Sequence, residues 1–245
     1  MIKYDNNTKY VFIGDIHSCY DVLVKILTKI GVEVENSKLR YTEKFKERKI
    51  VFTGDLIDRG PKPVEVLRLA MKLCNDGKAL AVLGNHDDKL RRALLGNNVK
   101  LNHGLDFTLE NVLSEGEEFA KKVLEFLSEC PHQYILDDGK VIVAHGGLHE
   151  DLHEIDTNRM KTFALYGDIT GKFDEKNYPL RRDWAKEYEG KRLVVYGHTI
   201  IEDTTLTNNT INLDTGCFKT GILSGLLYPE LEIVQVMINK SDEKN

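Results

Sequence analysis

Short apolar runs recur along the chain, and each of the first three leads through a polar loop into a segment with helical spacing. These runs lie at 10–13, 50–52 and 80–83. Apolar side chains then return every three or four positions, which predicts helices over about 22–30, 63–76 and 90–95, each stopped near a glycine. Three strand–helix units in series predict a parallel sheet, because helical crossovers join parallel strands.

The pattern changes between about 97 and 138 and again between 148 and 192. The first segment reads as a polar loop and then a charged amphipathic helix that Pro131 ends, and the second is irregular. Apolar runs resume at 141–144, 193–196 and 211–213, and a hairpin is predicted over 222–238, so the second half should be antiparallel or mixed. We expect a single domain over 1–240 with insertions at about 97–138 and 148–192, and a polar tail at 241–245.

Composition and charge narrow the class of protein. Hydrophobic residues make up 41% of the chain and charged residues 30%, which is typical of a globular protein. No basic segment followed by an apolar one opens the chain and no long apolar stretch occurs, so we expect a cytoplasmic protein without a membrane partner. The four cysteines are scattered, which favours reduced thiols. The net charge of −5 argues against an extensive nucleic-acid surface but not against an anionic substrate.

Polar residues with ligand chemistry follow the apolar runs. A single Asp or His at a strand end is usually a cap or a satisfied buried group, but here the pattern repeats along the chain. The residues at these strand ends are Asp15, His17, Asp55, Asn85, His86, His145, His198 and Asp214. Oxygen and nitrogen donors without thiolate suit octahedral Mn-like ions, and also admit Fe or Zn. After Asp55, Asp58 can orient a partner and Arg59 can bind phosphate.

Several motifs in one order carry a resemblance to a known family. They are Gly14-Asp15-x-His17, Gly54-Asp55-x-x-Asp58-Arg59-Gly60, Gly84-Asn85-His86-Asp87, His145-Gly146-Gly147 and Gly197-His198-Thr199. This set resembles the calcineurin-like metallophosphoesterases of the PPP phosphatase type. The stretches 166–171, 181–186 and 213–217 are similar to the PrpE-type bis(5'-nucleosyl)-tetraphosphatases, and the phosphatase domain of bacterial polynucleotide kinase-phosphatase is similar too. The resemblance implies a mixed α/β fold in which two packed mixed β-sheets are flanked by helices.

The resemblance also implies a metal centre with two divalent ions. Mn is expected, with Fe, Zn, Ni or Co as alternatives. One ion would be held by Asp15, His17 and His198, the other by Asn85 and His145, and Asp55 would bridge both. Asp214 matches an acidic position of the nearest relatives and is expected either to bind a metal or to support the site.

The catalytic roles come from the same resemblance. Arg59 would clamp phosphate, and His86, oriented by Asp58, would protonate the leaving oxygen while a metal-bound hydroxide attacks phosphorus in line. Arg181 and Arg182 are candidates for a second phosphate contact. Trp184 could stack on a base or pack locally, and the sequence leaves this open.

Four other polar residues are interpreted as surface residues and not as parts of the site. Lys89, Arg91 and Arg92 could read a polyphosphate chain, although the solvated face of a helix is the preferred interpretation. His103 lies in an insertion and is interpreted as a surface residue.

The sequence therefore predicts a two-metal phosphohydrolase that cleaves nucleoside polyphosphates such as diadenosine tetraphosphate. The first alternative is a protein serine/threonine or tyrosine phosphatase on the same site, with a phosphoprotein as partner in place of a small-molecule substrate. The second is a non-catalytic metal-binding module. His86, Asp58 and Arg59 argue against the second alternative, because a structural metal site does not need them.

Overall fold

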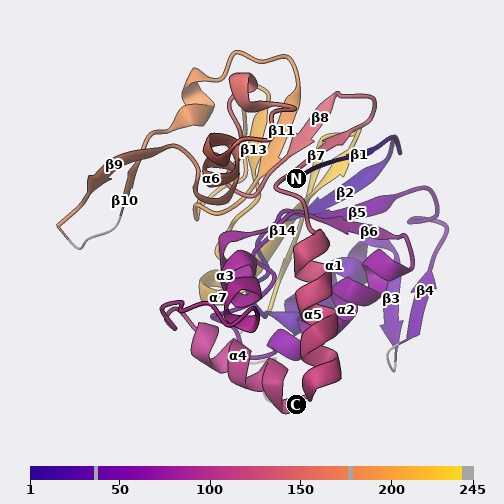
Figure 1. Ribbon diagram of the computed structural model, residues 1–245. Coiled ribbons are helices and arrows are strands. Elements are labelled where there is room, and N and C mark those ends of the chain that lie inside the picture. The colour runs from indigo at the N-terminus through magenta and orange to yellow at the C-terminus, as the bar shows by residue number, and fades with distance from the viewer. Residues whose placement is uncertain (36–37, 176–178, 239–245) are drawn as a thin grey trace.

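The computed structural model describes residues 1–35, 38–175 and 179–238, and its framework is a pair of β-sheets packed face to face (Figure 1). The five-stranded sheet has the order β15 (Glu232–Met237), β14 (Ile222–Tyr228), β2 (Tyr10–Ile13), β5 (Lys49–Phe52) and β6 (Ala79–Ala81). The six-stranded sheet has the order β1 (Ile2–Asp5), β7 (Gln133–Leu136), β8 (Val141–Val143), β11 (Leu193–Tyr196), β13 (Thr210–Asn212) and β12 (Leu206–Thr207). The polar tail predicted at 241–245 lies outside the described residues.

The five-stranded sheet contains the predicted parallel core. β2 pairs in parallel with β5, and β5 pairs in parallel with β6. β14 runs antiparallel to both β2 and β15, which gives the hairpin expected near the end of the chain. The mixed sheet predicted from the sequence is therefore confirmed.

In the six-stranded sheet, the three central strands carry the later site motifs. β8, β11 and β13 are mutually parallel, whereas β7 is antiparallel to β8. The hydrophobic pattern missed β7 and its parallel partner β1, because these strands are short and pair across more than a hundred residues of sequence, from Ile2 to Gln133. The segment interpreted as an insertion at 97–138 thus ends in a strand of this sheet.

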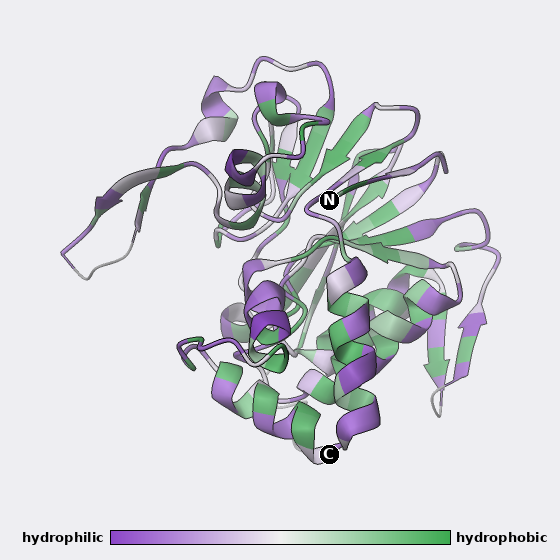
Figure 2. Ribbon diagram, viewed as in Figure 1, coloured by the Kyte–Doolittle hydropathy of each residue, from purple (hydrophilic) through white to green (hydrophobic). Residues whose placement is uncertain are grey.

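Helices cover the outer face of the five-stranded sheet, where Figure 2 shows apolar residues along strands and facing helices. They are α1 (Tyr20–Ile30), α2 (Pro63–Asn75), α3 (Asn85–Leu94), α4 (Leu105–Ser114) and α5 (Glu117–Glu129), with the short α7 (Cys217–Thr220) beside β14. The sequence pattern predicted a loop where α4 forms. Few α4 side chains are buried, which weakens its amphipathic signal: they are Leu105, Thr108 and Val112.

Among the residues that the structure describes, three hydrophobic clusters join these layers. One, which includes Phe12, Val51, Val143 and Leu213, lies between the two sheets. A second lies beneath α1 to α5, and a third covers the outer face of the six-stranded sheet under α6 (Asn158–Tyr166). Among the described residues, no helix is both long and apolar enough to cross a membrane.

Smaller elements complete the chain. A hairpin of β9 (Ile169–Phe173) and β10 (Pro179–Arg181) extends away from the body of the molecule, and β3 (Val32–Glu35) pairs with β4 (Lys38–Tyr41) at its other side (Figure 1). Two short 3-10 helices, Glu150–Leu152 and Trp184–Glu187, flank the third cluster. The base of the β9–β10 hairpin brings Arg181 toward the strand-end loops.

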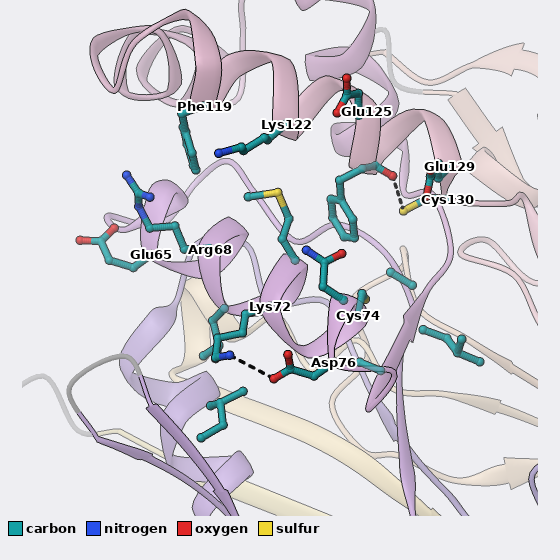
Figure 3. A pocket seen from close by; sticks show the side chains of 18 of the residues that line it. Glu65, Arg68, Lys72, Cys74, Asp76, Phe119, Lys122, Glu125, Glu129 and Cys130 are labelled. Atoms are coloured by element: carbon teal, nitrogen blue, oxygen red, sulfur yellow. Dashed lines mark hydrogen bonds and ion pairs between the residues drawn. The ribbon is translucent and has the colours of Figure 1, made fainter.

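A cavity of about 1050 Å³ lies beside α2 and α5, lined by Arg68, Lys72, Cys74, Phe119 and Lys122 among others (Figure 3). None of the described residues that line it belongs to the site predicted from the sequence. The candidate site is therefore formed elsewhere, by the loops at the strand ends.

Candidate active site

The predicted site residues follow two sets of parallel strands, one set in each sheet. In the five-stranded sheet, β2, β5 and β6 lead into the loops of Asp15 and His17, of Asp55, and of Asn85 and His86. In the six-stranded sheet, β8, β11 and β13 lead into His145, His198 and Asp214. Parallel strands end at one edge of their sheet, so packing the two sheets face to face brings both groups of loops together.

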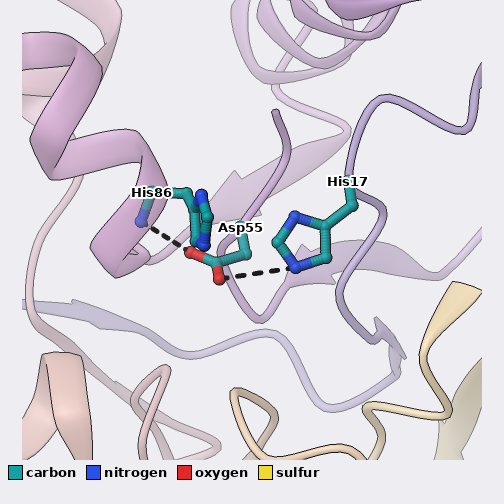
Figure 4. Close-up of side chains that lie close together, drawn as sticks. All are labelled: His17, Asp55 and His86. Atoms are coloured by element: carbon teal, nitrogen blue, oxygen red, sulfur yellow. Dashed lines mark hydrogen bonds and ion pairs between the residues drawn. The ribbon is translucent and has the colours of Figure 1, made fainter. Parts of the chain in front are cut away.

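Asp55 lies at the centre of the site, with 2% of its surface exposed. Its Oδ1 accepts a hydrogen bond of 2.9 Å from the His86 backbone nitrogen, and its Oδ2 lies 3.7 Å from His17 Nε2 (Figure 4) and 3.3 Å from His145 Nε2. Burial would raise the pKa of Asp55, but His145, His86 and His17 outweigh it and hold this pKa well below its usual range. Asp55 is therefore a carboxylate with a histidine on each side.

The backbone around Asp55 is strained and closely packed. Positive φ angles occur at His17 (47°), Asp55 (50°), Asp58 (70°), Arg59 (64°) and His198 (70°), where L-residues are uncommon. Gly84 is required on the neighbouring loop, because a Cβ there would lie 2.1 Å from the Asp55 backbone nitrogen. The fold thus holds the site loops in backbone conformations that are unfavourable for these residues in isolation.

His17 is oriented to offer one ring nitrogen to the site. Its Nδ1 donates to the Ile57 carbonyl oxygen at 2.9 Å, which leaves Nε2 unprotonated and directed toward Asp55. Burial lowers the pKa of His17 to about 4, against the opposing effect of Asp55. A neutral imidazole whose other nitrogen is fixed by a carbonyl is the usual form of a metal-binding histidine.

On the other side of Asp55, three side chains converge. His198 Nδ1 lies 2.8 Å from Asn85 Oδ1 and 3.1 Å from His145 Nε2, while His145 Nδ1 lies 3.0 Å from the Thr53 carbonyl oxygen. The resemblance had placed His198 with Asp15 and His17. The structure instead places the His198 ring with Asn85 and His145, and only the His198 backbone nitrogen bonds Asp15, at 3.0 Å to Oδ2.

Asp15 and Asp214 are two further buried carboxyl groups of the cluster. They are 1% and 2% exposed, and Asp214 Oδ1 accepts from the Gly216 backbone nitrogen at 2.9 Å. Burial, followed by the neighbouring Asp214, raises the pKa of Asp15 well above its usual range. Burial likewise raises the pKa of Asp214 to about 6. Two carboxyl groups that repel each other in a buried site are stabilised by a cation.

These donors fit divalent cations. Donor atoms of His17, Asp55 and His86 lie within 4.8 Å of one another, and so do those of Asp55, His145 and His198. Burial alone would lower the pKa of His145, but the carboxylates of Asp55 and Asp15 raise this pKa to about 10. The cluster therefore holds a proton where a cation would sit. Carboxylate, imidazole and amide donors without thiolate suit first-row divalent ions. The two groups share Asp55, as a bridging ligand would.

His86 lies on the His17 side of Asp55, and its Nδ1 is taken by Asp58. The distance from His86 Nδ1 to Asp58 Oδ2 is 2.6 Å, and Asp58 is completely buried. Burial opposes ionisation of His86, but Asp55 and Asp58 raise its pKa. Next in the chain, the Arg59 guanidinium is exposed and lies 4.6 Å over the Phe218 ring.

The three residues predicted to bind substrate have different environments. Arg181 Nη2 donates to His198 Nε2 at 2.9 Å and its Nε donates to the Tyr166 carbonyl at 2.9 Å, so Arg181 reaches the cluster. Arg182 instead pairs with Asp168 at 3.0 Å. Trp184 is 5% exposed, and its ring packs against aromatic neighbours, which favours the local-packing interpretation over base stacking.

Sequence reasoning missed two residues beside the cluster. The Phe218 ring lies 5.1 Å from the His17 ring, and the His103 ring lies 6.3 Å from the His86 ring. Phe218 follows the Asp214 loop by four positions, which is a weak signal. His103 lies in the loop after α3. This loop returns toward the site, and no local sequence pattern predicts that path.

A family model for calcineurin-like phosphoesterases matches residues 8–214. The chain is 41% identical over 231 residues, 93% of each chain, to the bis(5'-nucleosyl)-tetraphosphatase PrpE [asymmetrical] of Anoxybacillus flavithermus. A solved structure provisionally described as a diadenosine tetraphosphatase has a TM-score of 0.69 at 23% identity, covering 98% of both chains. A protein serine/threonine phosphatase from Saccharomyces cerevisiae has a TM-score of 0.64 at 13% identity, covering 98% of this chain and 84% of its own.

Fold and site together define a metal-dependent phosphoesterase. The chain belongs to the calcineurin-like phosphoesterase family, because the family model spans most of its length and every motif of the predicted set lies at the strand-end site. The mixed two-sheet fold expected from the sequence is that of its structural neighbours.

Proposed function

We propose that this chain hydrolyses dinucleoside polyphosphates, with diadenosine tetraphosphate as the reference substrate. The observation that carries the proposal is the 41% identity to a PrpE tetraphosphatase over 93% of both chains. The word "asymmetrical" in the name of that relative describes cleavage into unequal parts. We therefore expect AMP and ATP as products.

The metal assignment takes His17 and Asp55 from the first group of donors and Asp55, His145 and His198 from the second. It adds Asp15 and Asn85, which the resemblance implies as ligands, and keeps His86 for proton transfer. One ion would be held by Asp15, His17 and Asp55, and the other by Asp55, Asn85, His145 and His198, with Asp214 beside Asp15. Mn²⁺ is the expected ion, because carboxylate, imidazole and amide donors suit it. Fe, Zn, Ni or Co are the alternatives. Two such ions, when bound, activate water and neutralise charge on the phosphoryl oxygens.

The side chains of the site then position the phosphate and move the proton. Arg59 and Arg181 would bind the phosphoryl oxygens from opposite sides of Asp55, because each guanidinium offers a planar pair of donors. His86 would give its Nε2 proton to the leaving oxygen, while Asp58 accepts from Nδ1 and keeps the ring in position. The Phe218 ring supports the Arg59 guanidinium from below.

The fold does not choose between a nucleotide and a phosphoprotein substrate, because a yeast protein phosphatase shares it. Protein serine/threonine or tyrosine phosphatase activity is therefore the alternative that the experiment has to exclude. A non-catalytic metal module would have no use for the buried His86–Asp58 pair. The cytoplasmic location stays a prediction from the sequence.

A substrate panel tests the proposal. Metal-stripped protein is supplied with Mn²⁺, and kcat/KM is compared for diadenosine tetraphosphate, ATP, a phosphoserine peptide and a phosphotyrosine peptide. We expect diadenosine tetraphosphate to exceed both peptides by about 10²-fold or more, since a site selects through differential transition-state binding. A higher value for either peptide would assign the chain to the protein phosphatases instead.

A further inference from the structure

Cationic side chains gather around the His103 ring beside His86, and of these only Arg59 has a role assigned above. The His103 ring stands edge-on to the His86 ring, with centroids 6.3 Å apart. Arg59, His86 and Lys89 lie near enough to lower the pKa of His103. Lys100 and Arg92 act in turn on Lys89. This cationic cluster, formed by the cations Arg59 and Lys89 around the His103 ring, comes from the Asp55 loop, from α3 and from the loop between α3 and α4.

The loop that carries His103 is anchored to the site. The Lys89 amine donates to Asn102 Oδ1, which ties the loop to α3. Gly104 packs on the catalytic loop so closely that a Cβ there would lie 2.6 Å from the Arg59 backbone nitrogen. Between them, His103 has a φ of 60°, an uncommon conformation for a residue other than glycine, and its side chain is exposed. The loop therefore presents His103 beside His86 in a fixed position.

The charges that act most strongly on His103 are mainly positive. Burial and then the charges of Arg59, His86 and Lys89 lower the pKa of His103, and Asp58 opposes them. Asp58 is completely buried and already accepts from His86, so it is not exposed to neutralise the cluster. Cations held close together favour a polyanionic ligand.

We propose that His103 and Lys89 bind the leaving group, and that this leaving group is a nucleoside triphosphate. The inference rests on the proposed function. The proton donor His86 has to lie next to the leaving oxygen, so the cationic cluster beyond it faces the leaving part of the substrate. Of the two unequal parts of a tetraphosphate chain, the triphosphate carries more negative charge, and it matches this cluster better than a monophosphate does.

This orientation decides which bond is cut. A water oxygen forms a bond to the α-phosphorus of the mononucleotide part, and the bond from that phosphorus to the bridging oxygen breaks. The electron pair stays on the triphosphate oxygen, which takes its proton from His86, and the proton of the water is released to solvent. AMP therefore carries the new oxygen atom.

Isotope labelling tests this directly. Wild-type protein hydrolyses diadenosine tetraphosphate in H₂¹⁸O with Mn²⁺, and mass spectrometry locates the label. We expect ¹⁸O in AMP and none in ATP. Label in ATP, or two molecules of ADP as products, would overturn the inference while leaving the hydrolase in place. Absence of hydrolysis would overturn the proposed function and this inference with it.

Variants test the residues themselves. His103→Asn removes the imidazole but tolerates the positive φ, and Lys89→Met keeps the aliphatic stem. Inhibition constants for ATP and AMP are measured against hydrolysis of p-nitrophenyl phosphate. We expect each variant to weaken inhibition by ATP about tenfold and to leave inhibition by AMP unchanged, because Lys89→Met removes a cation and His103→Asn removes an imidazole N–H donor that bind the triphosphate. The control is Lys46→Met, whose exposed amine pairs with Glu43. Equal changes for both nucleotides, or no change for ATP, would contradict the assignment.

Discussion

His86 Nδ1 lies 2.6 Å from Asp58 Oδ2, in a pair that is nearly closed to solvent. The short distance and the buried carboxylate keep a proton on Nδ1. The raised pKa of His86, to which Asp55 and Asp58 contribute against the effect of burial, favours the imidazolium with a second proton on Nε2. The pair thus prepares a proton donor before substrate arrives.

Replacing the proton donor should affect substrates unequally. For His86→Ala we expect a loss of about 10²–10⁴-fold in kcat/KM with alkyl phosphates, which need a proton on the leaving oxygen, and a smaller loss with p-nitrophenyl phosphate. Rates across a series of leaving groups check this. Equal losses throughout the series would show that His86 positions substrate or binds metal instead.

The orienting carboxylate should matter for turnover but not for metal content. For Asp58→Asn we expect kcat to fall about 10–100-fold, since the ring of His86 loses its charged acceptor. Metal analysis of the same protein should give the wild-type content. Asp21→Asn is the control, because this exposed carboxylate pairs with Lys62 and is not a residue of the site. Loss of metal in Asp58→Asn would move Asp58 into the ligand set.

The two neighbouring arginines should behave differently. Arg181 reaches His198, whereas Arg182 already pairs with Asp168. We expect Arg181→Ala to lower kcat/KM about tenfold or more for both diadenosine tetraphosphate and p-nitrophenyl phosphate, because it would contact the phosphate that both share. Arg182→Ala should change kcat/KM for each substrate by less than about threefold, because exposed ion pairs contribute little binding free energy. The reverse order of effects would refute this placement of Arg181.

Gly147, two positions after His145, packs closely against the Trp184 ring. Its φ is 77°, and a Cβ there would lie 2.0 Å from a Trp184 ring carbon. We expect Gly147→Ala to lower the free energy of unfolding by about 1–3 kcal/mol or more, seen as a lower Tm. Gly171→Ala is the matched control, since its φ is 76° but nothing lies within 4 Å of the added Cβ. Equal losses in both variants would mean that backbone strain, and not the Trp184 contact, sets the cost.

The sequence predicted the parts of this fold that rest on local patterns. The strands β2, β5 and β6 and the closing hairpin follow from apolar runs and turns, and the polar residues after the runs gave the candidate ligands. Pairing across long separations was not predictable, as for β1 with β7. The grouping of His198 with Asn85 and His145 depends on how the two sheets pack, which no run of residues encodes locally. The place of His103 beside His86 depends in the same way on the path of a loop.

The central claim is that Asp55 is shared by two metal ions that hydrolysis requires. Its most direct test is the number of Mn²⁺ ions bound by metal-stripped wild-type protein and by Asp55→Asn, measured together with hydrolysis of diadenosine tetraphosphate. Asp55 lies between His17 and His145, at 3.7 and 3.3 Å, so its loss should disturb both donor groups. We expect about two ions and restored activity for the wild type, and weakened binding at both sites with little activity for Asp55→Asn. An Asp55→Asn protein that keeps both ions and a near-normal rate would contradict the account.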